Sequence, residues 1–120
     1  RQRTNTPMQA LVTLNDDQFI EASRAFAQRI LNSPVKSFSD RINWAFEVAT
    51  GHPADDLRRE VLKDAFEYQK EVFTKEPNRA DELLKIGETV RDTSVNVQEH
   101  ATWTILASMI LNLDETLNRE

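Results

Sequence analysis

The stretch TWTILASMILNL at residues 102–113 decides the fold of this chain. It is apolar around nearly the whole circumference of a helix, whereas a surface helix carries an apolar stripe on one face. Asn96 and Glu99 stand before it at the spacing of a capping box, in which two side chains satisfy free backbone N–H groups of the first turn. We therefore predict that the last helix begins near Asn96 and is the most buried element of the protein.

The residues at the N-terminal end of the chain indicate a short helix followed by a sharp corner. Thr6 is a suitable N-cap, and Pro7 is a suitable first residue for a helix that ends near residue 14. Asn15 and Gln18 then form a second capping box. The next helix is therefore expected to begin directly after Asn15.

The next two helices are predicted from apolar residues that recur at three- and four-residue steps. In residues 16–31 these residues form one face, and the polar residues, Arg24 among them, fall mostly on the opposite face. Ser39 is placed to cap the following helix, and Gly51 supplies the left-handed residue that ends it.

A longer helix follows, with Ala54 at its cap position and two carboxylates in its first turn, where the helix dipole favours negative charge. Pro77 ends this helix, and a short helix over residues 78–86 is ended by Gly87. The expected buried stripe of the long helix consists of Leu57, Val61, Leu62, Ala65, Phe66, Tyr68, Val72 and Phe73.

The composition also favours helices. The 120 residues include 2 Gly and 4 Pro, few for a β-rich protein, whose hairpin turns use both residue types. We predict an all-α antiparallel bundle of about five helices plus the short N-terminal helix, with the last helix most buried. Apolar residues make up 39% of the chain and the mean hydropathy is -0.58, so the core is lean, as in a piece of a larger domain.

Charge and cysteine content argue against several functions. The net charge is -5 and the Lys and Arg residues are not clustered, so nucleic acid is not an expected partner. The chain has no cysteine and therefore no disulfide, thiolate ligand or c-type haem attachment. No apolar run reaches the ~20 residues of a membrane span, so insertion of this segment into a membrane is not expected.

The residues that commonly carry chemistry do not form a recognisable pattern. His52 and His100 lack ligand spacings such as His-x-x-x-His, and we interpret both as surface or boundary residues, with Met109 in the core. The adjacent acids Asp16 and Asp17 stand at a helix start, where the dipole favours them. We therefore predict no catalytic, metal-binding or cofactor-binding residue within this segment.

Three aromatic residues offer one further candidate site. Trp44, Tyr68 and Trp103 could stack on a sugar ring. Each of them falls within an apolar pattern of helical spacing, so we predict that all three pack in the core.

Both ends of the chain resemble a known family. The residues RQRTNTPMQALVTLND at 1–16 and TWTILASMILNLDETLNRE at 102–120, with GHP at 51–53 between them, resemble the C-terminal part of the planctomycete-type domain of unknown function 1553. The likeness covers essentially the whole chain. The chain departs from the family pattern at Met8, Ala54 and Thr116.

The resemblance implies that residues 1–120 are a single helical segment, the C-terminal portion of a larger domain. In that family the domain belongs to large bacterial proteins that are expected to be exported, and it follows a cytochrome c-like domain. This implies a periplasmic or cell-envelope location, with the upstream part of the same chain and the neighbouring domains as partners. The resemblance assigns no activity, and any small-molecule ligand stays unknown.

Five polar residues belong to the motifs that carry the resemblance and lie at predicted helix ends. Asn and Asp at such positions usually cap helices or bond within turns, so we expect a structural role for these residues. The residues are Arg3, Asn5, Asn15, Asn112 and Asp114.

Three functions stay open on this basis. The lean core and the missing catalytic pattern favour a non-catalytic structural or interaction module of a larger exported protein. Alternatively, the segment completes an active site for polysaccharide processing, with Asn15 or Asp114 meeting upstream residues. The third function is a docking module for the neighbouring cytochrome c-like domain, with no redox centre in this segment.

Overall fold

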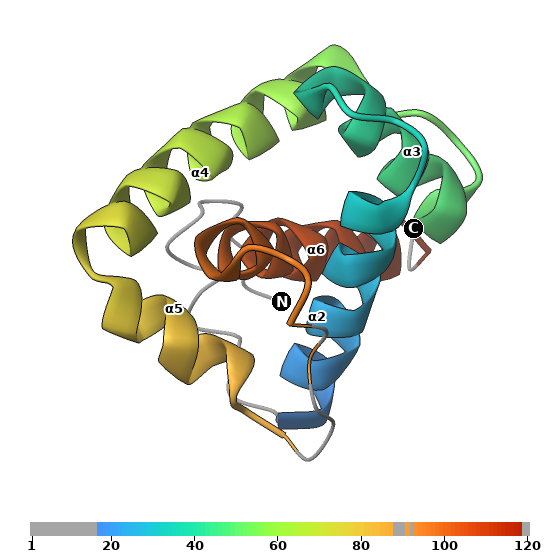
Figure 1. Cartoon of the computed structure of the whole chain (residues 1–120). Coiled ribbons are helices and arrows are strands. Elements are labelled where there is room, and N and C mark those ends of the chain that lie inside the picture. Colours follow the sequence, from blue (N-terminus) through green and yellow to red (C-terminus); the bar gives the residue numbers. More distant parts are fainter. Residues whose placement is uncertain (1–16, 88–90, 92, 119–120) are drawn as a thin grey trace.

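The last helix lies at the centre of the structure, as the sequence predicts. The computed structural model describes residues 17–87, 91 and 93–118, with side chains described as far as residue 112. Figure 1 shows the last helix passing through the middle of a frame made by the other helices. In chain order the described helices are α2 (Asp17–Asn32), α3 (Phe38–Thr50), α4 (Asp56–Lys75), α5 (Pro77–Leu84) and α6 (Val97–Asn118).

Helix α6 contacts all four of the other described helices. Every residue from 101 to 110 is buried, which agrees with a sequence that is apolar on all sides. The main apolar residues packed around it are Ile30 of α2, Ile42 and Phe46 of α3, Leu62 of α4 and Leu84 of α5. The all-α class and the central place of the last helix are therefore confirmed, and the described residues contain no strand.

The start of α6 confirms the predicted cap. The Oδ1 atom of Asn96 accepts a hydrogen bond from the backbone N–H of Glu99 at 2.9 Å. The carboxylate of Glu99 lies 3.4 Å from Nη1 of Arg41 on α3. The first turn of α6 is thus both capped by its own sequence and linked to a neighbouring helix.

Two other caps differ from the prediction by one or two residues. Ser37, rather than Ser39, caps α3, because its Oγ accepts from the backbone N–H of Asp40 at 3.1 Å. Asp55, rather than Ala54, caps α4, and Ala54 is buried in the core. Both predictions were wrong for the same reason: the apolar pattern does not fix the first residue of a helix, and only the backbone path decides which residue faces the free N–H groups.

The predicted end of α3 at Gly51 is confirmed, whereas α5 ends at Leu84 with Lys85 as its C-cap, before the predicted stop at Gly87. Gly51 ends α3 with a φ of 86° and Gly87 follows α5 with a φ of 95°. Pro77 is the first residue of α5, where its missing N–H costs no intrahelical hydrogen bond.

The buried face of α4 is narrower than predicted. Leu57 is 73% exposed and Tyr68 is 53% exposed, although both were expected in the core. Gln69 was not expected there, but it is 2% exposed. The predicted stripe spans about half of the helical circumference at 3.6 residues per turn, whereas the buried residues of α4 occupy a smaller sector. The residues that α4 buries are Leu62, Ala65, Gln69 and Phe73.

Some predictions lie outside the described residues. They are the short helix that begins at Pro7, its cap Thr6, and the capping box and corner at Asn15. The substitutions at Met8 and Thr116 also lie where the structure describes no side chain.

Candidate functional site

The predicted polar residues do not come together as a site among the described residues. Arg3, Asn5 and Asn15 lie outside that part of the chain, and Asp114 lies on α6 beyond the last described side chain. Asn112 is half-buried on α6, and its polar groups are not free of partners. Their structural role therefore stays a prediction.

A buried arginine instead joins α2 to the end of α5. The helical pattern places Arg24 on the polar face of α2, but Arg24 is 3% exposed. Its Nη1 donates to the carbonyl oxygen of Leu84 at 2.6 Å and to that of Ile86 at 2.9 Å. The prediction was wrong because periodicity cannot show that free carbonyls at the end of another helix lie opposite.

The ring of His100 extends this contact to α6. His100 is completely buried, so its interpretation as a surface or boundary residue was wrong. Its Nε2 lies 3.1 Å from the backbone oxygen of Arg24, and its Nδ1 lies 3.4 Å from Nη1 of Arg91. Since a guanidinium group can only donate, we assign the neutral tautomer in which Nδ1 accepts and Nε2–H donates. Arg91 also donates to the carbonyl of Val95 at 3.0 Å.

Glu21 completes this polar cluster, which we define as Glu21, Arg24, Arg91 and His100. A carboxylate oxygen of Glu21 lies 3.7 Å from Nη2 of Arg24, one turn further along α2. The side chain of Glu21 also lies against Gly87, where a Cβ atom would overlap it. The tight turn after α5 is thus pressed directly against α2.

The polar cluster joins three segments of the chain through hydrogen bonds. Converging buried charged groups often mark an active site, but among the described residues Arg24, Arg91 and His100 bond largely to backbone carbonyls. Buried polar groups that are satisfied in this way fix the relative position of the elements they join. The cluster therefore ties α2, the turn after α5 and the start of α6 to one another.

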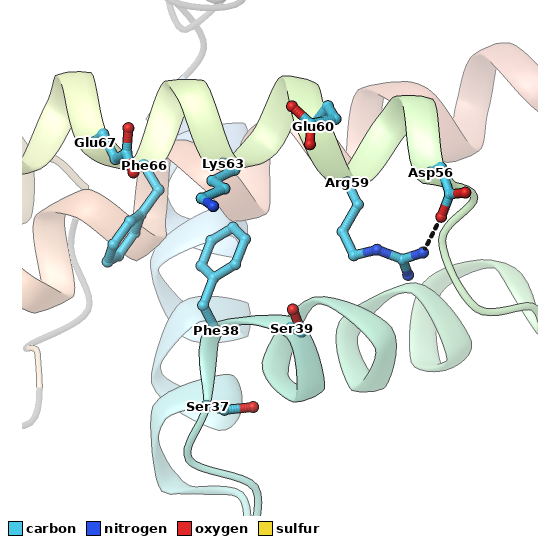
Figure 2. Close-up of a pocket in the computed structure, with 9 residues that line it drawn as sticks. All are labelled: Ser37, Phe38, Ser39, Asp56, Arg59, Glu60, Lys63, Phe66 and Glu67. Atoms are coloured by element: carbon cyan, nitrogen blue, oxygen red, sulfur yellow. Dashed lines mark hydrogen bonds and ion pairs between the residues drawn. The ribbon is translucent and has the colours of Figure 1, made fainter.

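A groove of about 570 Å³ lies between α3 and α4 (Figure 2). Its wall includes Phe38 and Phe66, whose ring centroids are 5.0 Å apart, and both rings pack at 5.8 Å against buried Trp103. Its cations are Arg59 and Lys63. The groove is therefore aromatic where it meets the core and polar or charged elsewhere.

The guanidinium group of Arg59 is hydrogen-bonded to three neighbouring residues of the protein. Its Nη1 donates to Oδ1 of Asn43 at 2.9 Å and to the carbonyl of Ala54 at 3.0 Å. Its Nη2 lies 2.6 Å from the carboxylate of Asp56, a contact drawn in Figure 2. These bonds brace the junction between α3 and α4, so we interpret Arg59 as a structural residue.

Asp55, beside the groove, has a lowered pKa for a structural reason. The backbone N–H of Arg58 donates to Oδ1 of Asp55 at 2.8 Å and is the main cause of the lowered pKa. Desolvation opposes the shift, and the positive charges of Arg58 and Arg59 add to it. A hydrogen bond to the ionised form always lowers the pKa of a carboxyl group. The shift therefore reflects the cap of α4 rather than acid–base chemistry.

The aromatic and histidine predictions have mixed outcomes. Trp103 is 1% exposed and in the core, as predicted, whereas Trp44 is half-buried under the guanidinium of Arg29 at 5.8 Å. Tyr68 is exposed, which corrects its predicted core position. His52 is exposed, as predicted. Met109 is in the core, as predicted.

The described residues contain no group of three or more His, Cys, Asp or Glu side chains placed to hold a metal ion. Within the same residues, the helices are too short or too polar to cross a lipid bilayer.

Comparison with protein-family models assigns the chain to a family. No curated protein and no solved structure matches the chain. The model of a family described as a protein of unknown function (DUF1553) matches residues 1–66, which is more than half of the 120 residues. The matched region includes α2, α3 and the first half of α4. The chain therefore belongs to the DUF1553 family.

Proposed function

We propose that this chain is a non-catalytic structural and interaction module, the C-terminal portion of a larger domain in an exported bacterial multidomain protein. The observation that supports this proposal is the polar cluster. Arg24 and His100 are almost completely buried, and their bonds join three segments of backbone. Reactive groups in an active site need access to a substrate, whereas these groups serve to fix helices.

The proposal predicts that the polar cluster supports more than its own helices. In the full-length protein, Arg24→Leu is expected to make the regions beyond this chain more sensitive to limited proteolysis. Arg79→Leu is the matched control, because Arg79 is an exposed arginine with a 3.8 Å ion pair to Glu76. An exposed pair of this kind contributes little to stability. Equal protease resistance in the two variants would contradict the structural role.

Catalysis is tested separately in the same full-length protein. A panel of polysaccharides is incubated with the wild type and with Asp114→Ala, and reducing ends are measured. We expect no turnover that depends on Asp114. Turnover that is lost in Asp114→Ala while the melting temperature stays unchanged would overturn the proposal in favour of an active site.

A further inference from the structure

An apolar stripe runs along the outside of α4. It consists of Leu57, Val61, Tyr68 and Val72, which the helical repeat places on one face. Leu57 and Tyr68 are 73% and 53% exposed, and the two valines are half-buried at the edge of the core. Figure 1 shows α4 at the border of the molecule, with α6 on its inner side. An exposed apolar surface with this continuity is a common mark of a binding face.

A row of carboxylates borders this stripe. Glu60, Asp64, Glu67 and Glu71 are all exposed, and each directly precedes an apolar residue in the sequence. Glu71 pairs with Lys75 at 3.0 Å, while the other three have no ion-pair partner among the residues that the structure describes. The apolar stripe and the acidic row therefore lie side by side over the same four turns of α4.

We propose that the apolar stripe of α4 binds a basic amphipathic helix of a partner protein. Such a helix would cover Leu57 and Tyr68 with its apolar face and place Lys or Arg beside the acidic row. From residue 57 to residue 72 the stripe is about 22 Å long at 1.5 Å per residue, which matches a partner helix of about four turns. This inference rests on the proposed interaction role and names the chemistry of the partner.

Charge favours this partner over two other occupants of the stripe. A second copy of the chain has a net charge of -5 and would bring its own acidic row. An anionic lipid surface would repel the carboxylates, since such surfaces attract basic segments. A basic helix alone gains from both the apolar contact and the charge.

The test uses the 120-residue chain and two fluorescent peptides in anisotropy titrations. One peptide of about 18 residues places leucines on one helical face and lysines beside them, and the control peptide has glutamate in place of lysine. We expect the lysine peptide to bind at least about tenfold more tightly. Raising the salt concentration from about 50 to about 500 mM should weaken its binding, because exposed charges are screened.

Variants of α4 locate the binding face. Leu57→Ser and Tyr68→Ser should each weaken the lysine peptide by about tenfold without changing the melting temperature, because both side chains are exposed. Val48→Ser is the matched control, since Val48 is 44% exposed on α3. Glu67→Gln should weaken binding and reduce its salt dependence, whereas Asp81→Asn on α5 should change neither.

Three results would overturn the inference. They are equal binding of both peptides, no binding of either, and a Val48→Ser variant that loses as much affinity as Leu57→Ser. Sedimentation that shows a dimer lost in Leu57→Ser would assign the stripe to a second copy instead. None of these results depends on turnover by the full-length protein, so a failure of this inference is separable from a failure of the proposed function.

Discussion

Helices α2 and α4 depart from their predicted burial patterns in opposite directions. Helix α2 buries Arg24, a charged residue on its predicted polar face, while α4 exposes Leu57 and Tyr68, apolar residues from its predicted core face. Both helices pack against α6. The difference shows that the surroundings of a helix, and not its own pattern alone, decide which side chains are buried.

The physical reason on the α2 side is the end of a neighbouring helix. The last carbonyl groups of a helix lack intrahelical donors and carry partial negative charge. Arg24 supplies a donor to Leu84 at the end of α5 and to Ile86 just beyond it. Arg24 therefore caps α5 from another helix. The two carbonyl groups that it bonds offset the cost of burying the charge of the guanidinium group.

The reason on the α4 side is the limited width of its contact. The sector of α4 that is buried contains Leu62, Ala65, Gln69 and Phe73, and α4 packs mainly against α6. The stripe that begins at Leu57 lies beyond this sector. An apolar surface left uncovered in this way is available for a partner.

The largest expected effect comes from breaking the buried contact of α2. Arg24→Leu leaves the carbonyls of Leu84 and Ile86 without this donor, so we expect the free energy of unfolding to fall by about 3 kcal/mol. Urea unfolding followed by circular dichroism measures the change. Arg79→Leu, at an exposed ion pair, should cost less than about 1 kcal/mol. Similar losses in the two variants would show that the buried contact is unimportant.

The turn pressed against α2 should be the next most sensitive position. Gly87→Ala places a side chain at a φ of 95° and against Glu21, and we expect a loss of about 2 kcal/mol. Gly51→Ala is the control, because Gly51 has a φ of 86° but no atom within 4 Å of the added Cβ. Its loss should be about 1 kcal/mol. Thermal and urea unfolding measure both variants. Equal losses of stability in Gly87→Ala and Gly51→Ala would show that the contact with Glu21 contributes nothing.

On α4, the buried amide of Gln69 is expected to be a weakness. Its Nε2 is buried and has no hydrogen-bond partner among the described residues. The substitution Gln69→Leu replaces this amide with an apolar side chain and should raise the free energy of unfolding by about 1 kcal/mol. Gln69→Ala should lower it, because a cavity would form. A loss of stability in Gln69→Leu would show that this amide has a partner after all.

The smallest expected effect concerns the exposed cap of α4. Asp55→Ala should cost about 1 kcal/mol at neutral pH. The folded-state pKa of Asp55 lies below the ordinary value of 3.8, so its contribution is fully present above pH 3.8. It is lost as the pH falls through the folded-state pKa. Urea unfolding should therefore show the difference between wild type and variant narrowing in acid.

Asp55→Asn is the control for this pH dependence. Its amide oxygen still accepts from the backbone N–H of Arg58 but does not titrate, so most of the stability should remain. A wild-type advantage over Asp55→Ala that grows on acidification would contradict the capping account.

Much of the fold follows from local patterns in the sequence. The run at 102–113 is apolar on all sides, and a helix of this kind is stable only when other elements surround it. Gly51 ends α3 because a residue without Cβ adopts a positive φ without strain. Asn96 caps α6 through a bond within its own first turn. Each of these features depends on residues that are close in the sequence.

The buried cluster and the exposed stripe could not be predicted in the same way. His100 and Arg24 are 76 residues apart in the chain, and Arg24 and Ile86 are 62 apart. A polar residue in a helix has the same pattern whether it faces water or a free carbonyl group. Helical periodicity likewise shows that Leu57 and Tyr68 share a face, but not whether another helix covers it.

The sequence by itself determined the all-α class, the end of α3 at Gly51, the cap of α6 at Asn96 and the central position of the last helix, because these depend on side-chain periodicity and local hydrogen bonds. The tertiary structure alone decided that Arg24 and His100 are buried and that one face of α4 stays open. These outcomes depend on which groups meet across the fold, since burial of a charge is tolerated only where a partner satisfies it.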